Sequence, residues 1–346
     1  MRDTVEETLP REYDVKKPLL IGGQAVLEGV MMRAPGAVAT AVRRPDGEIV
    51  IKRDRFVSLT ETSRICRLPL VRGAVALFEM LVLGIRTLNF SAEVALQAVN
   101  PPKQGNGTNG DGLARSHGTH RASLSLALTV SLSLAVGVAI FFVTPLLVAT
   151  SFFQVDQDPY RFNIVAGVVR ILIFLAYLGS ISAVKDIRRL FAYHGAEHKA
   201  VFAFERGLSL TVASAAGQSR FHPRCGTSFV LIVMLMAIVL FSLLDSLVVL
   251  WFGGITLVTR LLTHFPLIPL VAGASYELIR LSAKQSETVV GKVIAAPGLW
   301  LQRVTTKEPD EGQLEVALVA LRSALGVEVG RDRTGHHAAI EEISQN

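Results

Sequence analysis

Cysteine is scarce in this chain, and the usual signals of a secreted protein are missing. Cys66 and Cys225 allow at most one disulfide, which excludes a secreted disulfide framework. The first 18 residues mix acids and bases and lack a short apolar core with a cleavage site, so they are not a secretory signal. Charged residues make up only 18% of the chain, whereas hydrophobic residues make up 50% and the mean hydropathy is +0.43. This balance is typical of a membrane protein.

The net charge of +6 does not point to nucleic acid. The sequence contains no compact basic tract and no interleaved aromatic pattern of the kind that binds DNA or RNA. Membrane proteins collect Lys and Arg in their cytoplasmic loops, which explains the excess. We therefore expect membrane lipids, and no nucleic acid, among the partners.

Four apolar segments are long enough to span a bilayer, which needs about 20 residues. They cover residues 123–153, 162–184, 227–250 and 254–276. Asp245 and Arg260 flank a turn between the last two, where we expect their side chains to reach lipid headgroups. The alternative is that Asp245, Arg260 and His264 form a polar pathway inside the membrane.

Loop charge predicts the orientation of these segments. The connection 185–226 carries seven Lys or Arg residues, whereas the connection 154–161 carries one. The positive-inside rule therefore places 185–226 in the cytoplasm, together with both termini. The localisation that follows is the bacterial cytoplasmic membrane, crossed several times.

The residues before the first span show three patterns. Residues 19–33 are apolar but broken by glycines, which suggests turns or close backbone approach. Residues 37–56 read as a β-hairpin that turns at 45–47. Residues 68–90 are long and apolar but place three charges on one helical stripe, so we favour an amphipathic helix at the membrane interface over a spanning one.

The fold class that follows is mainly α: a polytopic helical membrane protein of about four spans with an interfacial helix and a small cytoplasmic β-hairpin. Towards the C-terminus, residues 297–307 look irregular, with Trp300 suited to the headgroup zone. Residues 312–325 read as an amphipathic helix with Asp310 as N-cap. The expected organisation is a polar tail (1–18), a cytoplasmic and interfacial part (19–99), a linker (100–122), the membrane region (123–280), a cytoplasmic segment (281–327) and a disordered tail (328–346).

The stretch 193–199 carries the clearest chemical signal. His194, Glu197 and His198 form the pattern H-x-x-E-H, and we expect the helix of the second span to continue through it to about Gly207. Histidines four residues apart share one helical face and can bind one ion, while the adjacent carboxylate handles a proton of water. The sequence thus predicts a divalent metal ion, most simply Zn²⁺, with Glu197 as general base.

A catalytic zinc usually has three protein ligands, and the pattern supplies two. Candidates for the third are Glu277, at the end of the fourth span, and His222 and Cys225, in the loop before the third. If both loop residues joined the two histidines, the site would have four ligands and would be structural. In the Gly-rich stretch, Gln24, Glu28 and Arg33 are candidates for contacts with substrate or with the ligands.

Several stretches of the chain, taken in order, resemble the YqhQ-like family of bacterial membrane proteins. They include GGQAVLEGVMMR, AVRRPDGEI, LVRGAVALFEML, ISAVKDIRRLFAYHGAEHKAVFAFERG, HPRCGTSF, PLVAGASYELIR and LQRVTTKEPDEGQLEVAL. The resemblance runs from about residue 20 to 325. It implies a multi-pass protein of the cytoplasmic membrane and a predicted metal-dependent enzyme, but it supplies no reaction.

The functional hypothesis is a metal-dependent hydrolase at the cytoplasmic membrane surface, acting on a peptide or lipid-linked substrate. The alternative is a non-enzymatic scaffold or assembly factor, which would bind a protein partner or a second copy and use the metal as a staple. A small transporter is a third option, disfavoured by the small number of spans.

Overall fold

The computed structural model describes residues 21–99, 128, 131–133, 135–152, 158–285, 288–327 and 340–341. The expected tail 1–18, the linker 100–122 and most of the tail 328–346 lie outside these residues. The chain divides into two compact units, and each is described by itself. The first comprises Met1–Pro101, Leu178–Ile232 and Ala272–Asn346, and the second Pro102–Tyr177 and Val233–Val271.

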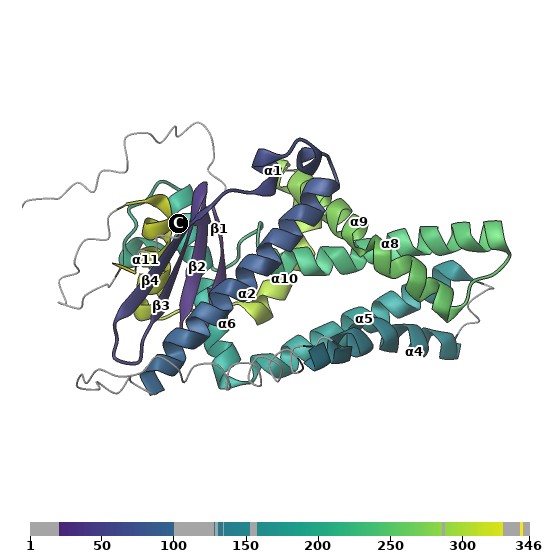
Figure 1. Ribbon diagram of the computed structural model, residues 1–346, viewed down its shortest axis with the longest axis horizontal. Helices are drawn as coiled ribbons and strands as arrows, with labels where there is room; N and C mark the ends of the chain where they lie inside the picture. Colours follow the sequence, from purple (N-terminus) through teal and green to yellow (C-terminus); the bar gives the residue numbers. More distant parts are fainter. Residues whose placement is uncertain are drawn as a thin grey trace, which may run out of the picture. The chain divides into compact units, whose positions relative to one another are not determined.

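A β-sheet forms the centre of the first unit (Figure 1). Its strands follow chain order and are β1 (Gly22–Val26), β2 (Gly29–Ala34), β3 (Gly36–Arg43), β4 (Ile49–Phe56) and β5 (Ile340–Glu341). The first four pair antiparallel, and β5 lies parallel to β4. The predicted hairpin is confirmed as β3 and β4. The Gly-rich stretch before it, for which we expected turns or close backbone approach, forms the two further strands β1 and β2.

Helices cover both faces of this sheet. On one face lie α6 (Lys185–Glu205), α7 (Val212–Ala216) and α11 (Glu311–Leu325), whose apolar side chains share a core with Val30 and Met32. On the other lies α2 (Val71–Val99), whose Leu83 packs with Met31 and Val38. Alternate residues of a strand point to opposite faces, so β2 buries apolar side chains on both, and only Arg33 in it is half-buried.

Helix α2 is the segment for which we favoured an interfacial position. Among the described residues, the helices long and apolar enough to cross a membrane do not include it. Two of its charges have partners inside the first unit: Glu79 accepts hydrogen bonds from the Ser58 hydroxyl and the Leu59 N–H, and Arg72 pairs with Glu277. Arg86, the third charge of the predicted stripe, is exposed. Ser58 also caps α1 (Leu59–Thr62), which with η1 (Ile65–Arg67) precedes α2.

Two helix boundaries differ from the sequence expectation. The second span and the metal-motif helix are not continuous: α5 (Pro159–Ser182) ends and α6 starts after Val184, whose backbone is extended. Residues 297–307, which we expected to be irregular, are largely helical. They belong to α10 (Val289–Thr305), which contains Pro297 in its interior. The expected α11 is confirmed, with a capping box at Asp310.

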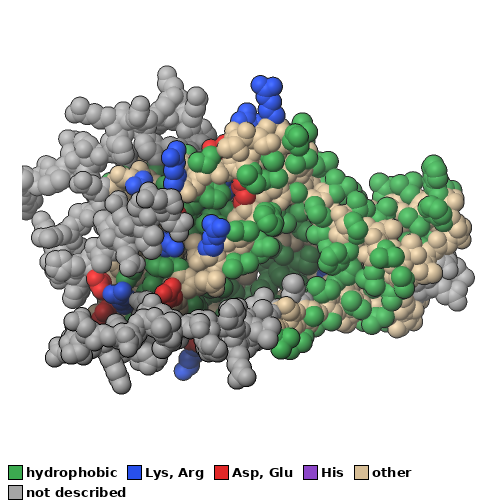
Figure 2. Space-filling model, in the orientation of Figure 1, with side chains coloured by type: hydrophobic (Ala, Val, Ile, Leu, Met, Phe, Trp, Pro, Cys, Tyr) green, Lys and Arg blue, Asp and Glu red, His purple; other side chains and the backbone are tan. Residues whose placement is uncertain are grey.

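Four helices are long and apolar enough to span a membrane, which confirms the expected number among the described residues. These candidate spans are Ser131–Phe152, Pro159–Ser182, Phe229–Phe252 and Leu257–Lys284. The first includes η2 (Ala139–Val143) and α4 (Thr144–Phe152), the second is α5, and the others belong to α8 (Gly226–Phe252) and α9 (Leu257–Lys284). Figure 2 shows mainly hydrophobic side chains on the visible surface of α8 and α9.

Inside the second unit, Asp245 and Arg260 are completely buried and form an ion pair. The expectation that they reach headgroups was wrong: the partners of each lie on neighbouring helices of the unit. The alternative grouping with His264 is the one that the structure has, since His264 Nε2 lies 2.9 Å from Asp245 Oδ1.

Candidate metal centre

Helix α6 presents the H-x-x-E-H pattern to the interior of the first unit, where every residue from Ala192 to Val201 is buried. The connection from α10 to α11 crosses this helix at Gly195. The N–H of Lys307 donates to the carbonyl of Phe191, and a Cβ at Gly195 would lie only 2.1 Å from the Lys307 carbonyl oxygen. A glycine in mid-helix costs about 1 kcal/mol relative to alanine, and here it makes room for a crossing chain.

The tautomer of His194 follows from its contacts. Its Nδ1 lies 2.8 Å from the carbonyl oxygen of Thr305, which can only accept a hydrogen bond. Nδ1 therefore carries the proton, and Nε2 keeps its lone pair. That lone pair faces the Sγ atom of Cys225 at 3.2 Å.

His198 repeats this arrangement one turn later. Its Nδ1 lies 2.5 Å from the carbonyl oxygen of Arg220, so Nδ1 again donates. Its Nε2 is buried and lies near the Cys225 thiol, with no other hydrogen-bond partner among the described residues. Burial lowers the pKa of His198, which favours the neutral ring that a metal requires.

The two histidines and Cys225 form one compact group. One ligand atom from each lies within 4.8 Å of the others, and all three side chains are buried. A backbone carbonyl that holds the far nitrogen of a histidine is the usual support of a metal ligand, and a buried lone pair without a partner is costly unless something binds it. The residues therefore fit a divalent ion held by two nitrogens and one sulfur, a set that suits Zn²⁺.

Glu197 is buried beside this group without being part of it. Burial raises the pKa of its carboxyl group, and the nearby His194, His222 and the hydrogen bond from the Gly23 N–H offset this only in part. Strand β1 comes so close that a Cβ at Gly23 would lie 2.9 Å from Glu197 Cγ. The predicted close backbone approach of the Gly-rich stretch is thus found at Gly23.

His222 uses both ring nitrogens elsewhere. Nδ1 accepts the Arg224 N–H at 3.2 Å, so Nε2 carries the proton and donates to Glu205 at 3.3 Å. Its backbone forms two hydrogen bonds with the Gln302 side chain of α10, at 2.7 and 2.8 Å. Of the two loop candidates, the structure therefore brings only Cys225 to the histidines, and His222 orders the loop that carries it.

Glu277 lies apart from the group because Arg72 holds it. The guanidinium donates to both carboxylate oxygens, one of them at 2.6 Å, and the pair joins α9 to the start of α2. A Cβ at Gly73 would collide with Tyr276 and Gly273, so the two helices are in close contact there. The geometry places Glu277 in a helix contact, not among the ligands.

The three candidates from the Gly-rich stretch lie outside the group as well. Glu28 accepts two hydrogen bonds from Arg189 and one from the Tyr193 hydroxyl, which ties the β1–β2 turn to α6 one turn before His194. The Arg33 guanidinium lies over the Phe56 ring at 4.4 Å. Gln24 lies on the opposite face of β1 from Gly23, against Gly84 of α2.

The backbone carbonyls of Thr305 and Arg220 were not foreseen, and no signal in the sequence marks them, because any residue type offers a carbonyl. Glu205 and Gln302 were likewise not proposed as supports. The supporting role of these two side chains is visible only in the folded protein, where three elements lie side by side: α6, the loop that precedes α8, and α10.

Comparisons with known proteins identify the family of the chain. Residues 68–327 match the family described as "Protein of unknown function (DUF1385)". The chain is 30% identical over 321 residues to the "Uncharacterized protein YqhQ" of Bacillus subtilis (strain 168), covering 90% of this chain and 94% of that protein. No solved structure matches significantly. The family match covers most of the chain and the relative aligns over nearly its full length, so this chain belongs to the DUF1385 family, together with YqhQ.

Proposed function

We propose that this protein is a metal-dependent hydrolase of the bacterial cytoplasmic membrane, with His194, His198 and Cys225 as ligands of a divalent ion, most simply Zn²⁺. The observation that carries the proposal is the matched orientation of the two imidazoles. Each donates its Nδ1 proton to a backbone carbonyl, and each keeps the Nε2 lone pair for the group that includes Cys225.

Three protein ligands are the number found in catalytic zinc sites, which keep one position open. When bound, such an ion acts as a Lewis acid on a carbonyl or phosphoryl oxygen and makes water easier to deprotonate. Glu197 would accept the proton that water loses on attack and return it to the leaving group. Its buried carboxylate suits this task, because burial raises the pKa of Glu197 and so makes it a stronger base than an exposed glutamate.

The proposed substrate class rests only on where the group of His194, His198 and Cys225 lies in the sequence relative to the membrane spans. The group belongs to the loop-rich part that the charge rule assigns to the cytoplasm, next in sequence to membrane spans on both sides. A peptide or a lipid-linked molecule at the membrane surface is the substrate that such a site would meet.

A structural ion is the second candidate, and burial is the observation that favours it. The three ligand side chains are only 2–9% exposed, and together they join α6, the loop before α8 and, through Thr305, α10. In that case the protein would be a scaffold or assembly factor for a protein partner or a second copy of itself. The ion would then stabilise the fold of the first unit.

Metal analysis of protein purified in detergent under metal-replete conditions tests both candidates. We expect about one ion per chain in the wild type and loss of it in H194A, H198A and C225S. The matched control is E277Q, which should keep the ion because Glu277 is bound to Arg72. A wild type without metal would contradict the proposal and its alternative together.

Replacing the ion with Co²⁺ distinguishes a catalytic ion from a structural one. Co²⁺ bound by one thiolate should give a sulfur-to-metal absorption band that C225S removes. Adding a hydroxamate should then change the visible spectrum of the bound Co²⁺ if the ion has an open coordination position. The spectrum should stay unchanged if the ion is only structural. E197Q should keep the ion in either case, but only the hydrolase should lose complementation of a deletion strain.

A further inference from the structure

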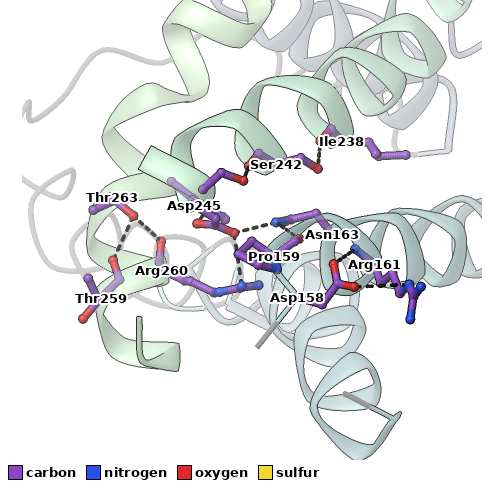
Figure 3. A network of polar contacts seen from close by, with 12 residues as sticks. Asp158, Pro159, Arg161, Asn163, Ile238, Ser242, Asp245, Thr259, Arg260 and Thr263 are labelled. Atoms are coloured by element: carbon purple, nitrogen blue, oxygen red, sulfur yellow. Dashed lines mark hydrogen bonds and ion pairs between the residues drawn. The ribbon is translucent and has the colours of Figure 1, made fainter. Parts of the chain in front are cut away.

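Four polar side chains from three candidate spans meet inside the second unit, three of which, Asn163, Asp245 and Arg260, are labelled in Figure 3. Asn163 belongs to α5, Asp245 to α8, and Arg260 and His264 to α9. Their exposed fractions are 5%, 0%, 0% and 1%, so all four side chains are buried. Ionisable groups are rare in membrane spans and usually mark a functional site.

Asp245 is the acceptor at the centre of this cluster. Its Oδ2 accepts from the Asn163 amide at 2.6 Å and faces Arg260 Nη2 at 3.3 Å, as Figure 3 shows. Its Oδ1 lies 2.9 Å from His264 Nε2. Three donors therefore surround the carboxyl group of Asp245, one of them the cationic guanidinium of Arg260.

His264 is the one member with a lone pair left over. Because Nε2 donates to Asp245, Nδ1 carries the lone pair of the neutral ring. Nδ1 is buried and has no hydrogen-bond partner within the described part of the chain. The ring stacks on Phe241 at 4.0 Å with an interplanar angle of 4°, which fixes its orientation.

Interhelical adhesion explains Asn163, Asp245 and Arg260, which bond one another across the helices. Adhesion between helices does not explain His264, whose second ring nitrogen is buried without a hydrogen-bond partner. Burying such an atom costs free energy of folding and adds nothing to the contact between helices. A proton would satisfy Nδ1, and the resulting imidazolium would lie against the carboxylate of Asp245. Since the cluster is closed on all sides, a proton is the ligand small enough to enter without opening it.

The surroundings of His264 contain no competing carboxylate among the described residues. Helix α8 contributes Asp245 and the Phe241 ring, and α5 contributes the neutral Asn163. On α9 itself, Arg260 lies one turn earlier. The other charged groups of α5 have partners of their own, since Arg170 donates to the Phe141 carbonyl and Arg161 pairs with Asp158.

We propose that His264, oriented by Asp245, is a proton-binding site within the membrane spans of this protein. The proton adds to the Nδ1 lone pair, the imidazole becomes an imidazolium, and no other bond is made or broken. His264 lies seven residues from the start of α9 and Asp245 seven from the end of α8, or about 10 Å along each helix. The charge rule assigns these ends to the outer side, so the site would take its proton from outside the cell.

Nitrogen NMR of histidine tests this site directly. Protein labelled with ¹⁵N-histidine in lipid nanodiscs is titrated from about pH 8 to about pH 5, the range in which histidines change charge, and H264Q identifies the signals of His264. We expect the His264 signals to start as the Nε2–H tautomer and move to the doubly protonated form. Signals that stay in one neutral form throughout would overturn the proposal.

Asp245 supplies the second readout. In D245N the stabilising charge is absent, so His264 should bind its proton at least about tenfold more weakly. The matched control is T263V, on the neighbouring residue, whose hydroxyl bonds only to carbonyls of its own helix and should not affect the titration. An unchanged titration in D245N would show that Asp245 does not orient a proton site. If D245N does not fold, the wild-type titration decides alone, and neither result depends on the metal group.

Discussion

The backbone N–H of Gly23 donates a hydrogen bond to the carboxylate of Glu197, which joins the first strand to the metal motif across 174 positions of the chain. The contact is close because residue 23 has no side chain: a Cβ there would lie 2.9 Å from Glu197 Cγ and 2.6 Å from the Met31 carbonyl oxygen. Position 23 thus determines where the proposed general base lies.

A methyl group at position 23 should therefore displace Glu197. We expect G23A to lower the free energy of unfolding by about 1–3 kcal/mol, since one of the three close contacts is to the backbone and cannot rotate away. The matched control is G22A, because nothing lies within 4 Å of a Cβ at Gly22. Thermal unfolding in detergent measures both, and equal stability of the two variants would contradict the close contact.

The crossing of the α10–α11 connection over α6 makes a second prediction. In G195A the new Cβ would stand 2.1 Å from the Lys307 carbonyl oxygen, so the connection must shift, and with it Thr305, which holds His194. We expect a loss of about 1–3 kcal/mol of stability and weaker metal binding.

The control for G195A is G179A. Gly179 also lies in a helix, but a Cβ there would meet nothing within 4 Å. Alanine should be neutral or stabilise the protein by up to about 1 kcal/mol at that position. Metal content and unfolding temperature, measured on both variants, distinguish a crowded glycine from a helix-propensity effect. G195A with wild-type values of both would refute the crossing.

Glu205 should make stability depend on pH in the acid range. Burial raises the pKa of Glu205, but the hydrogen bond from His222 and the charges of His222 and Arg224 outweigh it, so the pKa lies below the ordinary 4.5. The unfolded chain then binds the proton more tightly, and stability is fully present above pH 4.5 and lost as the pH falls through the folded-state pKa.

The variant E205Q removes this contribution. At neutral pH it should be about 1–2 kcal/mol less stable than the wild type, because it loses charge-assisted hydrogen bonds to His222 and Arg224. The difference should shrink below pH 4.5, where the wild type also becomes protonated. Unfolding curves at several pH values test this, and a difference that did not depend on pH would rule out the ionised carboxylate as its cause.

Periodicity and length were enough to predict the parts of the fold that depend on local sequence. The four candidate spans, the hairpin around Gly47 and the capped helix after Asp310 all follow from the sequence. Strands β1 and β2 were not, because their glycines suggested turns. Gly23 packs closely against α6 and Gly29 against β3, and such contacts are a property of the tertiary structure.

The candidate site shows the same limit. The spacing of His194 and His198 on one helical face followed from sequence, whereas the choice of Cys225 over Glu277 did not. Chemistry and topology made Glu277 one of three open candidates, but Arg72 of α2 occupies both of its carboxylate oxygens. Selecting a third ligand requires knowing every competing partner, and Arg72 lies 205 positions away from Glu277 in the chain.

The apolar surface of α10 gives the last prediction. Val289, Val293 and Trp300 are 77%, 65% and 50% exposed, and their spacing of four and seven residues places them on one helical face. A face of this kind with a tryptophan is typical of a helix that lies in the headgroup region of a membrane.

Trp251 and Trp300 are the only tryptophans, so W251F leaves Trp300 as the single fluorescent probe. In bilayers, lipids brominated near the headgroup should quench its fluorescence more than lipids brominated at the tail end, and W300F in the same background should abolish the signal. Quenching by acrylamide in water without quenching by brominated lipid would instead place this face of α10 away from the membrane.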